Sequence, residues 1–218
     1  QIIYPELFLQ QAFEMVKKAG GLCIIDEVQI GFGRTGTHFW GFETCDVTPD
    51  IVTMGKPMGN GHPISAVITR RDIADAFDNG MEYFNSFGGN PVSCSIGQAV
   101  LDVVREEHLQ ENALMVGTYL LELLEELKNK HAIIGDVRGK GLFLGVELIK
   151  DHDELIPAGN EADLAANLMK DNNILISNDG PDQNVLKIKP PLVFTKDNSL
   201  ELAETLDRVL DQDNFKIG

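Results

Sequence analysis

Apolar residues recur at helical spacing over residues 6–19, and two glycines end this segment. A short apolar run without polar alternation follows at 22–25, and similar runs stand at 51–54 and 64–68. Such a run after a helix is typical of a strand that is buried on both faces of a parallel sheet. The order of helix, strand, loop and strand therefore predicts an α/β arrangement in the first part of the chain.

The second part of the chain changes to mainly helical spacing. From Pro91 to Lys128 the pattern predicts two helices that meet near residues 106–108. Glycines alternate with apolar residues over 138–148, which predicts one strand with a bulge or a close backbone approach. The remaining segments predict, in chain order, a helix at 161–171, a strand near 174–177, a turn at 179–181, a strand at 184–189 and a helix at 197–211.

The change of pattern places a domain boundary near residue 104. We expect α/β structure over 1–104 and a smaller α+β domain over 105–218. A chain of 218 residues that is 43% hydrophobic is long enough to bury a substantial core.

Composition removes several classes of partner. The net charge of -16 argues against nucleic acid or an anionic membrane surface. No apolar run approaches the roughly 20 residues that a membrane-spanning helix needs. The cysteines, Cys23, Cys45 and Cys94, have no paired spacing, so we expect small buried thiols in a reducing compartment and no metal site.

Two predicted strands end in residues that can carry chemistry. Asp26 follows the first strand and Lys56 follows the second, and ligands of open α/β sheets bind outside the carboxyl ends of the strands. A lysine amine can hold an aldehyde cofactor as a Schiff base. A carboxylate can keep a pyridine nitrogen protonated, which makes the ring an electron sink. Adjacent parallel strands would bring this pair to one crevice.

The sequence around Asp26 also permits another interpretation. The stretch IIDE is similar to the metal-binding strand of a P-loop ATPase, which requires a G-x-x-x-x-G-K-[ST] loop. Here Pro57 follows Lys56, and Asp50 stands at the position of the first glycine. The chain therefore lacks that loop. The possibility that such a loop lies outside this sequence stays open.

Three motifs in register resemble the class III aminotransferases. They are LCIIDEVQIGFGRTGTHFWGFE, PDIVTMGKPMGNGHPISAV and FNSFGGNPVSC, and the resemblance continues along most of the chain. It implies a fold type I enzyme that depends on pyridoxal phosphate. The chain would be the second part of the large domain, a mainly parallel sheet with helices, followed by the small α+β domain. It would thus be a piece of a polypeptide about twice as long.

The resemblance assigns roles to five residues. Lys56 would form the Schiff base, and Asp26 would pair with the pyridine nitrogen. Val28 would pack against the ring, and Gln29 would lie near the ring hydroxyl. Ser86 stands where the family usually has threonine, a hydroxyl that reaches the cofactor phosphate of the neighbouring subunit. The resemblance therefore also implies a homodimer with shared active sites, and we expect it in the cytoplasm, with the mitochondrial matrix left open.

The segment NVLKIKPPL bears on the substrate. Lys187 stands where amino-acid transaminases of the family usually have a carboxylate-binding arginine, and Lys189 replaces a small residue. This pattern resembles the branch of phospho-lyases that act on phosphoethanolamine or phosphohydroxylysine and release phosphate and ammonia. Three hypotheses follow: a transaminase of an ω-amine or amino acid, a phospho-lyase that binds its phosphorylated amine through both lysines, and a catalytically silent piece that keeps its dimer contacts.

Overall fold

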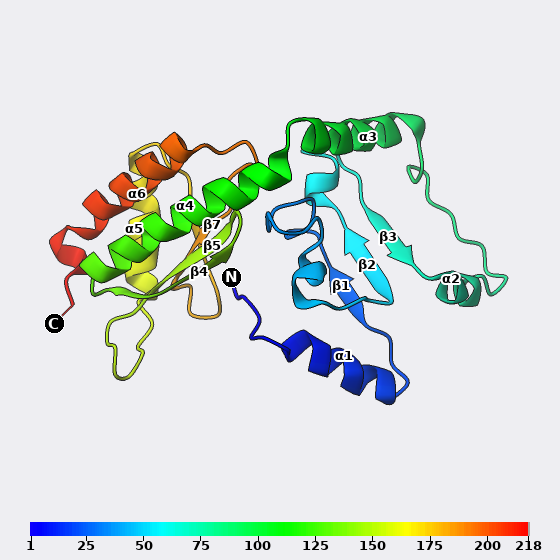
Figure 1. Ribbon diagram of the computed structural model, residues 1–218, viewed down its shortest axis with the longest axis horizontal. Helices are drawn as coiled ribbons and strands as arrows, with labels where there is room; N and C mark the ends of the chain where they lie inside the picture. The colour runs from blue at the N-terminus through cyan, green and yellow to red at the C-terminus, as the bar shows by residue number, and fades with distance from the viewer. Residues whose placement is uncertain (218) are drawn as a thin grey trace. The chain divides into compact units, whose positions relative to one another are not determined.

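The computed structural model describes residues 1–217, which form two compact units. The N-terminal unit comprises Tyr4–Gln110, and the C-terminal unit comprises the chain from Glu111 onward together with Gln1–Ile3. Figure 1 shows helices and strands in both units, which confirms the mixed α/β fold class expected from the sequence. The assignment of 1–104 and 105–218 to a large and a small enzyme domain stays a prediction.

The N-terminal unit is built on the three-stranded sheet β1-β2-β3. In this sheet β1 pairs with β2 in parallel, and β2 pairs with β3 in antiparallel orientation. The helices and strands, in chain order, are α1 (Phe8–Lys18), β1 (Ile24–Asp26), β2 (Ile51–Met54), β3 (Ala66–Thr69), α2 (Arg71–Phe77) and α3 (Pro91–Glu106). The short helix α2 was not expected from the sequence.

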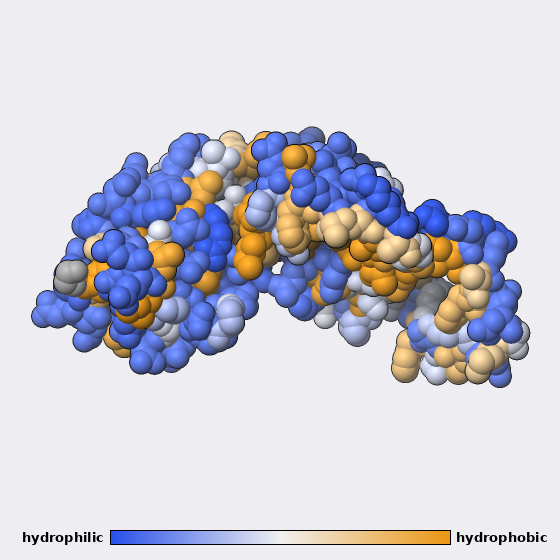
Figure 2. Space-filling view, turned by 90° about the horizontal axis from the view of Figure 1, so that it is seen from below, coloured by the Kyte–Doolittle hydropathy of each residue, from blue (hydrophilic) through white to orange (hydrophobic). Residues whose placement is uncertain are grey.

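The third strand corrects two expectations. A parallel β3 would need a crossover connection of a dozen or more residues, usually a helix. The connection over 55–65 holds only the 3-10 turn η2 (Lys56–Met58), so the chain turns back along β2. Burial on both faces was also wrong, since Ile24 is 59% and Val67 66% exposed. Figure 2 shows orange, apolar surface among hydrophilic residues on the face of the molecule in view.

A buried carboxylate fixes the end of this sheet where β1 and β2 begin. Asp50 is 4% exposed, and its Oδ2 accepts the backbone N–H of Cys23 at 2.8 Å. Its Oδ1 accepts a hydrogen bond from the guanidinium of Arg70, which follows β3. One side chain thus connects the ends of three strands, and pairing with the guanidinium offsets the cost of burying its charge.

The C-terminal unit is built on the antiparallel sheet β4-β5-β7-β6. Its elements are α4 (Leu109–Lys130), which begins at the boundary, β4 (Ile134–Lys140), β5 (Phe143–Leu148), α5 (Gly159–Asp171), β6 (Ser177–Asp179), β7 (Val185–Ile188) and α6 (Lys196–Leu210). The single strand expected over 138–148 is therefore a hairpin. Gly141 lies in its turn with φ +54°, a conformation that glycine adopts at little cost.

The core of the C-terminal unit lies between this sheet and the three helices α4, α5 and α6. Alternate side chains of the strands enter it, and the helices supply the other side of the layer. Fully buried members from both sides include Leu120, Leu124, Met169, Leu144, Leu186, Ile188 and Leu206. The fold of this unit thus follows from its own apolar pattern.

The cysteines only partly follow the expectation of small buried residues. All three are free thiols, and Cys23 is buried, but Cys94 is exposed on α3. No helix in the described part of the chain combines the length and apolar character needed to span a bilayer.

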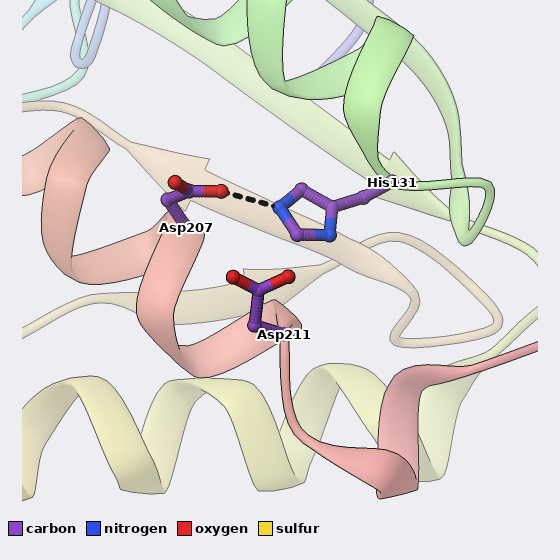
Figure 3. A group of neighbouring side chains, drawn as sticks. All are labelled: His131, Asp207 and Asp211. Atoms are coloured by element: carbon purple, nitrogen blue, oxygen red, sulfur yellow. Dashed lines mark hydrogen bonds and ion pairs between the residues drawn. The ribbon is translucent and has the colours of Figure 1, made fainter.

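An ion-pair network joins the end of α4 to α6 (Figure 3). The buried His131 lies 2.6 Å from an oxygen of Asp207, and Asp211 lies beside them. The ammonium of Lys130 is 2.7 Å from both oxygens of Asp207 and 3.3 Å from Asp211. Burial opposes ionisation of Asp207, but the bonds from Lys130 and His131 outweigh it and lower the pKa of this carboxyl.

This network predicts an acid-sensitive contribution to stability. Because the pKa of Asp207 is lower in the folded state, its contribution is present above about pH 4 and is lost as the pH falls through the folded value. We expect Asp207→Asn to cost roughly 1 to 3 kcal/mol at pH 7 and progressively less below about pH 4. Thermal unfolding at several pH values measures this, with Glu204→Gln on the exposed face of α6 as control. An equal cost at every pH would contradict the assignment.

Candidate functional site

Asp26 and Lys56 lie at the same edge of the β1-β2-β3 sheet. Asp26 is the last residue of β1 and is in register with Thr53 of the parallel neighbour β2. Lys56 follows two residues after β2 and starts the turn η2. Both side chains are exposed at this edge. The parallel pairing therefore brings together a carboxylate and an amine that are 30 positions apart in the sequence.

Local contacts orient the residues at this edge. The Oδ1 atom of Asp26 accepts the backbone N–H of Val28 at 2.8 Å, which turns the carboxylate along the outgoing chain. A β-carbon placed at Gly55 would lie 3.8 Å from Cγ2 of Val28 and 3.6 Å from Cβ of Ser65. The side chain of Val28 is thus beside the backbone that leads directly into Lys56.

The backbone of Lys56 has an unusual conformation. Its φ of 22° lies in the left-handed region, which costs a residue with a side chain on the order of 1 kcal/mol or more. Strain of this kind persists only where the surrounding structure imposes it, and it occurs often at functional sites. Such a conformation fits a residue with a functional role, which for Lys56 stays a prediction.

The neighbouring carboxylate, Glu27, has a structural role. Glu27 is fully buried, and its two oxygens accept the backbone N–H groups of Gly41 and Phe42, both at 2.9 Å. Burial raises the pKa of the Glu27 carboxyl, and the two hydrogen bonds oppose this effect. Glu27 therefore ties the end of β1 to the start of the 3-10 turn η1 (Gly41–Cys45).

The glycine-rich loop before η1 is closed by aromatic packing. Phe32, Phe39 and Trp40 form a cluster with ring centroids 4.8 to 5.5 Å apart. In the same loop, burial lowers the pKa of the Arg34 guanidinium below its ordinary value. The ring contacts and the two hydrogen bonds of Glu27 together hold the loop that follows Asp26.

The remaining predicted site residues have less defined surroundings. Gln29 is exposed just beyond the β1 edge. Ser86 lies on the exposed loop between α2 and α3, where Oδ1 of Asn85 accepts the N–H groups of Phe87 and Gly88. Roles for Gln29 and Ser86 stay predictions, and that of Ser86 requires a neighbouring subunit.

Lys187 and Lys189 belong to the C-terminal unit. Lys187 lies on the face of β7 opposite to the core, in register with Gly145, which in turn is in register with Arg138 of β4. The ammonium of Lys187 is 3.6 Å from Asp179, and that of Lys189 lies 5.7 Å from the ring centroid of Phe143. Both lysines also line a cavity of about 690 Å³ between the segment before β6 and α6.

Comparison with known proteins decides the family. The family model described as "Aminotransferase class-III" matches residues 1–210. The chain belongs to the class III aminotransferase family. Pyridoxal phosphate is the cofactor of this family, as expected from the three sequence motifs.

Individual relatives carry two kinds of name. The chain is 52% identical over 203 residues to "Alanine--glyoxylate aminotransferase 2-like" of Drosophila melanogaster, covering 92% of this chain and 41% of the relative. It is 47% identical over 213 residues to "Ethanolamine-phosphate phospho-lyase homolog 1" of Caenorhabditis elegans, covering 96% of this chain and 46% of the relative.

A solved structure of a phospholyase is also similar to this chain. The phospholyase from Arthrobacter in complex with phosphoethanolamine superposes with a TM-score of 0.92 at 42% identity, covering 96% of this chain and 50% of that chain. The chain thus spans about half the length of the proteins that it matches.

The residues at the β1–β2 edge fit a pyridoxal phosphate group. The donor set contains a carboxylate for the pyridine nitrogen, an amine for the aldehyde and an apolar Val28 for the ring face. The cluster of His131, Asp207 and Asp211 has ligand atoms within 4.8 Å of one another, but its carboxylates already form ion pairs with Lys130 and Lys216. We therefore interpret that cluster as an ion-pair network and do not assign a metal to it.

The support formed by Glu27 can be tested by substitution. Glu27→Gln replaces one acceptor oxygen by an amide donor that faces a backbone N–H, so one buried N–H loses its partner. We expect a loss of roughly 1 to 3 kcal/mol in the free energy of unfolding. Chemical denaturation measures it, with Glu14→Gln on the exposed face of α1 as control. A loss no larger than that of the control would contradict the role of Glu27.

Proposed function

We propose that the protein containing this chain is a pyridoxal-phosphate enzyme that acts on a primary amine through Lys56. The single observation that carries the proposal is the parallel pairing of β1 with β2, which places Asp26 and Lys56 at one edge. Membership in the class III aminotransferase family supports it. The proposal includes a homodimer in which the two subunits share their active sites. It also includes a cytoplasmic location.

Each residue at the edge has a distinct task in this proposal. When bound, the cofactor supplies an electron sink for the bond that breaks at the amine-bearing carbon. Asp26 holds the pyridine nitrogen protonated through a charge-assisted hydrogen bond. Lys56 holds the aldehyde carbon covalently and, once released, moves a proton between the substrate carbon and the cofactor. Val28 supports the ring, and Gln29 approaches its hydroxyl.

The first candidate reaction is transamination of an ω-amine or an amino acid. The name of the Drosophila relative, at 52% identity, supports this candidate. In this reaction, Lys56 would move the proton from the substrate carbon to the cofactor side. Water would then release the carbon skeleton as a carbonyl compound, and the amino group would stay on the cofactor until a keto acid accepts it. The side chain of the substrate then needs no leaving group.

The second candidate is elimination of phosphate and ammonia from a phosphorylated amine. Lys187 and Lys189 favour this candidate. Two ammonium groups suit a phosphomonoester, whereas a carboxylate is bound best by a planar guanidinium, which Lys187 replaces. The phosphoethanolamine complex of the Arthrobacter phospholyase and the name of the Caenorhabditis relative also support it. Both candidates share the tasks of Lys56 and Asp26 up to the breaking of the carbon–hydrogen bond and differ in what happens next.

Substitution of the lysine tests the shared part of the proposal. We expect Lys56→Ala in the full-length protein to lose the visible absorbance of lysine-bound cofactor and at least 1000-fold in turnover, because the substitution removes the amine that the proposal assigns to the cofactor aldehyde. Lys17→Ala on α1 serves as the control. A wild-type dimer that stays colourless with pyridoxal phosphate would instead support a catalytically silent protein.

Product analysis separates the two candidates. The full-length protein is incubated with phosphoethanolamine and, separately, with a plain ω-amine plus 2-oxoglutarate. We expect products from only one of the two incubations. Phosphate and ammonia without glutamate identify the lyase, and glutamate without phosphate identifies the transaminase. Coupled assays for phosphate and glutamate on the same preparation give the answer, and neither product from either substrate would contradict both candidates.

The role of Lys187 has its own test. If Lys187 binds the substrate phosphate, Lys187→Ala should raise the KM for phosphoethanolamine by roughly 10- to 100-fold, the range for one charge-assisted contact. The KM for a plain ω-amine should change less than about twofold. Lys170→Ala on α5 is the matched control. Equal changes for both substrates would show that Lys187 acts only on the structure.

A further inference from the structure

A hydrogen bond joins the connection after Lys56 to the first turn of α3, two segments that lie in separate sequence motifs. The Nε2 atom of His62 lies 2.8 Å from Oγ of Ser93, 31 positions further along the chain. His62 lies in the connection that follows Lys56, and Ser93 lies in the first turn of α3. Both residues are half-buried. The sequence motifs assign neither residue a role.

Ser93 is in turn fixed to the loop that carries Ser86. Asn90 is the N-cap of α3, and its Oδ1 accepts the N–H of Ser93 at 2.9 Å. Its Nδ2 donates to Oγ of Ser93 at 2.9 Å and to the carbonyl of Phe87 at 2.6 Å. A continuous set of hydrogen bonds therefore runs from His62 to the residue immediately after Ser86.

The other end of this set is close to Lys56. The N–H of His62 donates to the carbonyl of Gly59 at 3.0 Å, and that of Met58 donates to Gly55 at 2.8 Å. A β-carbon at Gly59 would lie only 2.1 Å from the carbonyl oxygen of His62, so the turn closes too tightly for another residue. These backbone bonds thus connect His62 to the turn that begins at Lys56.

Packing beside the hydrogen bond supports a defined position for the loop. A β-carbon at Gly97 of α3 would meet Met58 O at 3.8 Å and Ile64 Cδ1 at 3.5 Å. The helix thus rests on the segment between Lys56 and β3. The bond between His62 and Ser93 adds a polar, directional contact to this packing.

We propose that His62 and Ser93 form a positioning link that holds the Lys56 loop and the Ser86 loop in one fixed arrangement. The proposal rests on the proposed function, in which Lys56 holds the aldehyde end of a cofactor and Ser86 approaches a phosphate end. If Ser86 serves the neighbouring subunit, the link connects the lysine of one site to the phosphate contact of the other. His62 and Ser93 are positioning residues and do not contact the reacting atoms.

The first test uses the cofactor-free full-length protein and requires no activity. Ser93→Ala and His62→Ala should each raise amide hydrogen exchange over residues 57–65 by about fivefold, the change expected for loss of about 1 kcal/mol. Exchange over β4 and β5 should not change. Ser95→Ala, exposed on the same helix, is the matched control, and Ser93→Thr should restore slow exchange because it keeps the hydroxyl.

The second test measures cofactor binding. Each alanine variant should weaken pyridoxal phosphate binding about fivefold to tenfold, and the double variant should lose no more than either single variant, because both remove one link. Additive losses, or binding and exchange within twofold of wild type, would overturn the proposal. Should Ser93→Ala fail to fold, His62→Ala and His62→Gln apply the same test from the loop side, with the glutamine variant expected to retain binding. Wild-type protein that binds no cofactor would refute the proposed function, whereas the exchange experiment would still decide the link.

Discussion

The parallel pairing of β1 with β2 is the constraint on which the candidate site depends. Parallel strands end at the same edge of a sheet, so Asp26 and Lys56 meet there although neither is near the other in the chain. An antiparallel pairing would have sent the two residues to opposite edges. Asp50 secures the other end of the same strands through Cys23 and Arg70, and Glu27 anchors the turn beyond Asp26. Both buried carboxylates thus preserve the geometry that the exposed pair would use.

The C-terminal unit depends on a different constraint. Its sheet has one face packed against α4, α5 and α6, so β4, β5 and β7 each have an apolar side and a side free for polar residues. Lys187 and Arg138 lie on that second side, where each is held by carboxylates: Lys187 by Asp179, and Arg138 by Asp136 and Glu147. The substrate hypotheses differ in how these cations would be used. The fold of the unit is the same in either case.

Much of the fold could be predicted because apolar periodicity is a local property. The strand at 51–54 has the bounds predicted, and the break between α3 and α4 falls at 106–109 as expected. The direction of β3 could not be predicted, since it depends on whether a loop or a helix fills 55–65. The prediction of one strand over 138–148 was wrong. The turn at Gly141 that divides it into two strands is only two residues long and leaves no periodic signal. Asp26 and Lys56 could be proposed from the sequence because they end apolar runs and lie in the family motifs, whereas the link between His62 and Ser93 arises only when distant segments pack.

The most direct test of the central claim is a crystal structure of the full-length protein with pyridoxal phosphate. The account predicts continuous density between Lys56 Nζ and the cofactor, with a carboxylate oxygen of Asp26 at about 2.8 Å from the pyridine nitrogen, the distance of a charge-assisted hydrogen bond. A cofactor attached to another lysine, or a pyridine nitrogen beyond hydrogen-bond distance of Asp26, would contradict it.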